Sequence, residues 1–99
     1  MDTTGKTKWE VRWIDAWMDE DGFWEYNDTR EVGEIETDGE DVEQAKEAML
    51  NLLRENEIDG LSIAAGIYRW NVIDNCDPVT IEIVERKNDR PLYCATPID

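Results

Sequence analysis

Residues 41–56 read DVEQAKEAMLNLLREN, and this stretch decides the fold because it is the only long segment with a helical period. Advancing about 100° per residue divides it into two faces. The apolar face carries Val42, Ala45, Ala48, Met49, Leu52 and Leu53. The polar face carries Glu43, Gln44, Glu47, Asn51, Arg54 and Glu55. The pattern predicts one amphipathic helix whose apolar face packs on a sheet formed by the remaining segments.

The residues before the helix alternate as strands do. In the first predicted strand, 8–18, one face carries Trp9, Val11, Trp13, Asp15 and Trp17. The turn signal at 19–22 ends in Gly22 and predicts a hairpin to a second strand at 23–26. A loop is expected at 27–30 and a third strand at 31–36.

The segment just before the helix leaves two points open. The apolar positions of the third strand are an odd number of residues apart, so Gly33 is expected to mark a bulge. Two pairs have the spacing of a capping box, Thr37 with Glu40 and Asp38 with Asp41. The sequence does not choose between these two helix starts.

The residues after the helix predict three more strands. They lie at 67–73, 79–86 and 92–95, after a connector at 57–66 and with turns at 75–78 and 87–90. Short connections favour antiparallel neighbours. We therefore predict one α+β domain over residues 1–99, a mostly antiparallel sheet in βββαβββ order with the helix on one face. Residues 1–7 are expected to form a flexible arm and 96–99 a tail.

Composition limits where the protein works and what chemistry it can perform. No apolar run reaches ~18 residues and the first seven are polar, so we expect a cytoplasmic protein that does not span a membrane. Cys76 and Cys94 are expected to be free thiols there, with a bridge between neighbouring strands as the alternative. The chain has no histidine and no CxxC pair, which argues against zinc and against histidine-assisted nucleophiles. We predict no enzymatic activity, no metal and no cofactor.

The charge is strongly negative and uneven. The net charge is −15, of which residues 19–59 contribute −13. Such a charge opposes binding to nucleic acids and anionic membranes and favours a basic partner. The candidate partner-binding carboxylates lie in the hairpin turn and around the helix start: Asp19, Glu20, Asp21, Asp38, Glu40, Glu43 and Glu47. A solubilising surface without a specific partner is the alternative.

Three of the acids form a row along the predicted helix. Glu40, Glu43 and Glu47 are spaced i, i+3, i+7, which places neighbours ~5–6 Å apart. That distance is broadly comparable with phosphate spacing on a nucleic-acid strand. The row is therefore consistent with a nucleic-acid-mimicking inhibitor of a basic protein.

Five tryptophans in 99 residues suggest two interpretations. Trp9, Trp13 and Trp17 share a strand face and are expected to form a core layer under the helix. The alternative is an exposed aromatic platform for a ligand or partner, because one helix covers a limited area. Trp24 and Trp70 are the candidates for partial exposure and for an aromatic ligand site.

Two segments of the first half, Asp15-Ala16-Trp17 and residues 22–28 (GFWEYND), carry a resemblance. They resemble small uncharacterised proteins of bacterial phages and conjugative elements. Those proteins show a similar aspartate–alanine–tryptophan step and then a glycine–aromatic–asparagine stretch before a single helix. The resemblance implies a small accessory protein and brings no catalytic or binding residues with it. Because such elements encode host-defence antagonists, it favours an inhibitor.

The sequence thus predicts a non-enzymatic interaction protein whose acidic surface engages a basic protein partner. A binder of small ligands at an aromatic site is the alternative.

Overall fold

The computed structural model describes residues 5–55, 66, 68–74 and 79–98. Its elements in chain order are β1 (Lys6–Met18), β2 (Trp24–Asp38), α1 (Val42–Glu55), β3 (Tyr68–Ile73), β4 (Thr80–Glu85) and β5 (Arg90–Ile98). The helix agrees with the predicted 41–56 to within one residue at each end. β1 begins within the predicted arm and β5 extends into the predicted tail.

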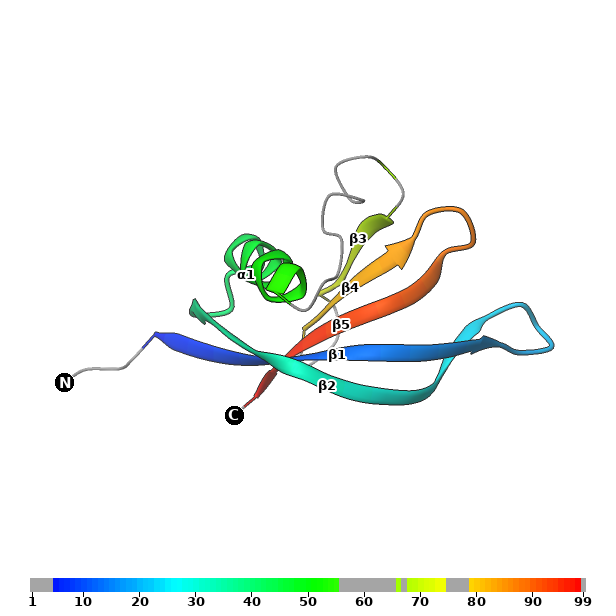
Figure 1. The fold of residues 1–99 in the computed structure, drawn as a ribbon, viewed down its shortest axis with the longest axis horizontal. Coiled ribbons are helices and arrows are strands. Elements are labelled where there is room, and N and C mark those ends of the chain that lie inside the picture. Colours follow the sequence, from blue (N-terminus) through cyan, green and yellow to red (C-terminus); the bar gives the residue numbers. More distant parts are fainter. Residues whose placement is uncertain (1–4, 56–65, 67, 75–78, 99) are drawn as a thin grey trace.

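The described strands form one antiparallel sheet in the order β2-β1-β5-β4-β3, with α1 on one face (Figure 1). The α+β class, the antiparallel sheet and, within the described residues, the single helix are therefore confirmed. The predicted βββαβββ order is wrong, because the described order is ββαβββ. The segments predicted as separate strands at 23–26 and 31–36, with the loop between them, all belong to β2 except for Phe23, which precedes it.

β2 continues through its polar middle because β1 supplies a pairing partner along nearly its whole length. The register shifts twice, leaving Val32 and Asn27 of β2 without a partner residue on β1. Each is an extra residue of the kind found in a β-bulge, which bends the strand and increases its twist. The bulge expected at Gly33 is thus found at its neighbour Val32, and the second bulge, at Asn27, lies within the stretch predicted as a loop.

The apolar face of α1 packs on the sheet as predicted. Ala45, Met49 and Leu53 are fully buried, and the other three residues of the predicted face pack against them as partly buried side chains. The sheet side of this core includes Trp9, Val11, Ile35, Ile81, Ile83 and Ala95. Met49 and Leu53, the large side chains of this face that are fully buried, contribute ~1.5–3 kcal/mol each before chain entropy is subtracted, and the partly buried Val42 and Leu52 contribute less.

Trp9 is the largest side chain of this core and is also hydrogen-bonded. Its ring is 0% exposed, and its Nε1 donates to Thr37 Oγ1 at 2.8 Å. Thr37 in turn donates to the carbonyl of Gly39. A buried indole N–H needs such an acceptor, so Thr37 joins the end of β2 to the core.

The second face of the sheet carries a smaller core of its own. Ile14, Ala16 and Cys94 are buried there, and Trp24 packs against them. The bent edge strand β2 brings Tyr26 across to β4, where its hydroxyl donates to Glu82 Oε2. Cys94 is a free thiol. Cys76, its alternative bridging partner, lies outside the described residues.

Candidate interaction surfaces

The helix start is organised by Asp41 rather than by either predicted capping box. Asp41 Oδ1 accepts the backbone N–H of Gln44 at 3.2 Å, and its carbonyl accepts that of Ala45 at 3.0 Å. The Gln44 side chain turns back, with Oε1 accepting the backbone N–H of Asp38 at 2.8 Å. Asp41 is therefore the N-cap. Its negative carboxylate also interacts favourably with the positive end of the helix dipole.

The acidic surface, defined as Asp38, Glu40, Glu43 and Glu47, lies where β2 passes into α1. All four residues are exposed. Two lysines offset them: Lys6 Nζ lies 2.5 Å from Asp38 Oδ1, and Lys46 Nζ lies 3.3 Å from Glu43 Oε2. The hydrogen bond from Lys6 lowers the pKa of Asp38, and Asp38 raises the pKa of Lys6. Among the described ion pairs, none involves Glu40 or Glu47.

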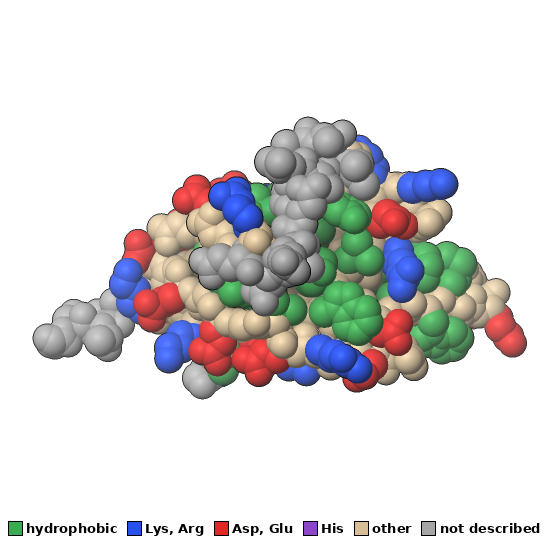
Figure 2. Space-filling model, viewed as in Figure 1, with side chains coloured by type: hydrophobic (Ala, Val, Ile, Leu, Met, Phe, Trp, Pro, Cys, Tyr) green, Lys and Arg blue, Asp and Glu red, His purple; other side chains and the backbone are tan. Residues whose placement is uncertain are grey.

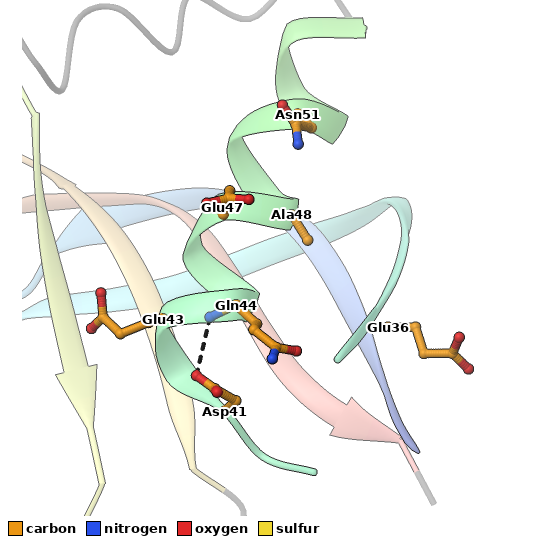
Figure 3. Close-up of a pocket in the computed structure, with 7 residues that line it drawn as sticks. All are labelled: Glu36, Asp41, Glu43, Gln44, Glu47, Ala48 and Asn51. Atoms are coloured by element: carbon orange, nitrogen blue, oxygen red, sulfur yellow. Dashed lines mark hydrogen bonds between the residues drawn. The ribbon is translucent and has the colours of Figure 1, made fainter. Parts of the chain in front are cut away.

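A shallow hollow of about 450 Å³ runs beside this surface, between α1 and the end of β2. Its lining residues are Glu36, Asp41, Glu43, Gln44, Glu47, Ala48 and Asn51. In Figure 3, the side chains of Gln44 and Ala48 lie on the side of the helix toward Glu36, whereas Glu43 points the other way. The hollow is open and lined by four carboxylates, so its chemistry suits cationic side chains rather than an enclosed apolar ligand.

The hairpin turn does not join the acidic surface. Asp19, Glu20 and Asp21 lie at the far end of the molecule from the helix (Figure 1). Asp19 Oδ1 accepts the backbone N–H groups of Asp21 and Phe23, both at 2.9 Å. These bonds, first that of Phe23, lower the pKa of Asp19. Asp19 therefore holds the turn together, which leaves Glu20 and Asp21 as its exposed acids.

Trp24 and Trp70 do not form a joint aromatic site, because they lie on opposite faces of the sheet. Trp24 belongs to the second-face core, and its Nε1 donates to the carbonyl of Asn88 at 2.9 Å. Trp70 packs against the helix-side core, with Lys46 Nζ 5.7 Å from its ring centroid. Both are partly buried, as predicted, but each is already used in packing.

A second candidate surface lies on β1, at two of the three tryptophans for which an exposed platform was the alternative to a core layer. The aromatic row, defined as Trp13, Asp15 and Trp17, occupies alternate positions on the helix-side face of β1. Trp13 is 36% and Trp17 51% exposed, so the predicted core layer holds only at Trp9. A comparison of lengths could have predicted this exposure. A strand of 13 residues extends ~43 Å, whereas a helix is only ~10–12 Å wide and cannot cover the whole strand. Figure 2 shows apolar side chains, with charged ones among them, toward the hairpin end of the molecule.

The polar cluster around Glu82 on the second face is structural. Glu82 is 8% exposed, and Asn71 Nδ2 donates to its Oε1 at 2.9 Å while Tyr26 donates to its Oε2. Burial, followed by this bond to Glu82, raises the pKa of Tyr26. Both carboxylate oxygens are thus satisfied, and the cluster ties the bent end of β2 to β4.

Comparison with protein-family models, curated proteins and solved structures finds no match to this chain. Within the described residues, no helix combines the length and the apolar character needed to cross a membrane. In the same part of the chain, no three Cys, Asp or Glu side chains are grouped as a metal ion requires. The surfaces themselves therefore carry the functional argument.

Proposed function

We propose that this chain is a non-enzymatic interaction protein that engages a basic protein partner through its acidic surface. The observation that carries the proposal is the gathering of Asp38, Glu40, Glu43 and Glu47 at the junction of β2 and α1, with two lysines as the paired bases. Residues 19–59 hold −13 of the net charge of −15, so the long-range field of the molecule also attracts cations.

The rigid helix makes this surface suited to a specific contact. Glu43 and Glu47 are displayed on successive turns of α1, ~5–6 Å apart, whereas Glu40 precedes the N-cap Asp41, so the predicted helical row of three holds only for the other two. A partner that binds nucleic-acid phosphates has cations at a comparable spacing. The resemblance to phage and conjugative-element proteins favours an inhibitor that occupies the nucleic-acid-binding site of such a partner. An inhibitor of this kind would act in the bacterial cytoplasm.

Affinity capture from bacterial lysate tests the proposal. The wild type should retain basic proteins at low salt and release them by ~0.5 M salt, where screening acts within a few Å. The paired variant Glu43→Gln/Glu47→Gln should retain less. Glu20→Gln/Asp21→Asn removes the same charge at the other end and should retain as much as the wild type. Equal loss in both variants, or capture that is insensitive to salt, would contradict a local acidic site.

Ligand binding at an aromatic site is the second candidate function. The exposure of Trp13 and Trp17 favours it, although the residues differ from the predicted Trp24 and Trp70. Binding of an apolar ligand should persist at ~0.5 M salt and alter tryptophan fluorescence. Salt resistance therefore separates this function from charge-led association.

A further inference from the structure

We infer that the aromatic row, Trp13, Asp15 and Trp17, docks an extended segment of the partner that carries arginine at alternate positions. The inference rests on the proposed function, because it takes the partner to be basic, and adds where and how a basic segment would lie. The row is distant from the acidic surface, at the hairpin half of β1. It combines aromatic faces with carboxylates on the same side of the sheet.

The exposure of the row has a structural cause. β1 pairs with β5 only from Lys8 to Trp13, whereas it pairs with β2 as far as Met18. From Ile14 onward, the described β1 therefore has a neighbouring strand on one side alone. Trp17 consequently lacks a flanking cross-strand side chain on its other side and is 51% exposed.

The charges on this face complement a cation. The cross-strand partner of Asp15 is Asp28, that of Trp17 is Glu25 and that of Trp13 is Arg30, so the row and its partners carry three carboxylates and one guanidinium. Directly opposed side chains lie ~4.5–5.5 Å apart at Cβ, and like charges there are destabilising. Asp15 Oδ2 accepts a hydrogen bond from Asn27 at 3.1 Å, and no described ion pair neutralises either aspartate. A guanidinium between them would relieve this repulsion.

The spacing of the row matches an extended peptide. Residues two apart on one strand face are ~6.6–6.8 Å apart, so Trp13, Asp15 and Trp17 lie at equal steps. An extended segment presents alternate side chains at the same step. Its outer two arginines can stack on the tryptophan rings, and its central one can pair with Asp15 and Asp28. Arginine is favoured over lysine because its planar group stacks on aromatics and also bonds carboxylates bidentately.

A synthetic peptide with alternating arginine and serine (GRSRSRG) tests the inference on the full chain, with tryptophan fluorescence and calorimetry as readouts at low salt. Trp13→Ala, Trp17→Ala and Asp15→Asn should each weaken its binding about three- to tenfold. Phe23→Ala removes another aromatic side chain of the same hairpin, which is 69% exposed. Glu34→Gln removes a negative charge from the opposite face of the sheet. Both control variants should bind as the wild type does.

Two further peptides test the chemistry. A citrulline version keeps the shape and loses the charge, and a block version (GRRRSSG) keeps the charge and loses the alternation. Both should bind at least about threefold more weakly than GRSRSRG. Equal binding of the block version would overturn the proposed register, and equal binding of the citrulline version would overturn the role of charge.

Stability provides an independent readout. Asp15→Asn should raise the melting temperature while it weakens peptide binding, because it removes the opposed charge. If Asp15→Asn binds more weakly and also has a lowered melting temperature, Asp15 has a structural role and the inference is overturned. The inference is also overturned if the wild type self-associates and Trp17→Ala abolishes that self-association, because the row then binds a second copy of the chain. If Glu43→Gln/Glu47→Gln weakens binding and Trp17→Ala does not, the acidic surface stands and the docking row fails. If the wild type captures no basic proteins from lysate but still binds GRSRSRG at the row, the proposed function is overturned and docking on the row is supported.

Discussion

Replacing Gly33 by alanine tests how closely α1 sits on the edge strand β2. A Cβ added at Gly33 would lie 3.1 Å from Leu52 Cδ1 and 3.2 Å from Leu52 Cδ2. Carbon atoms reach their best separation at about 3.5–4.0 Å. The new methyl group therefore has to push Leu52, or the helix that carries it, away by several tenths of an ångström.

The expected loss of stability follows from two opposing terms. Overpacking of this kind costs ~1–3 kcal/mol. Replacing glycine also reduces the freedom of the unfolded chain, which returns ~0.4–1 kcal/mol. The net loss should be ~1–2 kcal/mol, and each kcal/mol lowers the melting temperature by ~4–8 °C in a chain of this size.

A double-mutant cycle with Leu52→Ala is the appropriate assay, measured by urea unfolding. Leu52→Ala removes the side chain that the new methyl group meets, so Gly33→Ala should be neutral or stabilising in that background. The coupling energy should be ~1–3 kcal/mol. Gly22→Ala is the control, because Gly22 has a φ of +86° and no side-chain neighbour within 4 Å. Its cost is backbone strain and should be the same in both backgrounds.

Two results would refute this reasoning. One is a Gly33→Ala protein as stable as the wild type, which would mean that the helix does not rest on β2 at this point. The other is an additive cycle, in which the cost of Gly33→Ala is unchanged by Leu52→Ala. That outcome would assign the cost to the backbone of the neighbouring bulge instead of to helix packing.

Two further predictions concern the buried polar groups. Burial raises the pKa of the Cys94 thiol from 9.0 to about 11, so the folded chain keeps a proton that the unfolded chain releases. The free energy of unfolding should therefore fall by up to ~2–3 kcal/mol as pH rises through this range, and Cys94→Ala should reduce the slope in urea titrations at several alkaline pH values. Thr37→Val keeps the shape of Thr37 but removes the acceptor of the buried Trp9 N–H, 2.8 Å away. It should cost ~1–3 kcal/mol in thermal melts, and an unchanged melting temperature would show that the bond is dispensable.

The sequence by itself determined the features that depend on short-range periodicity and on composition. The helix and its buried face follow from spacings of three and four residues, and the two faces of β1 follow from strict alternation. The concentration of negative charge in 19–59 is likewise a property of composition. The predicted helix and strand faces agree with the structure because the same local pattern that favours each element also supplies its packing surface.

Only the tertiary structure decided the features that depend on distant partners. The polar stretch around Asn27 has the composition of a loop, yet it lies in β2 because β1 pairs with it and a bulge accommodates the extra residue. Trp9 and Trp17 have the same residue type on the same strand face, yet one is 0% and the other 51% exposed. Their difference arises from where α1 crosses the sheet and where β5 stops pairing with β1. Local sequence cannot encode this, because burial is set by residues that are far away along the chain and meet only in the folded state.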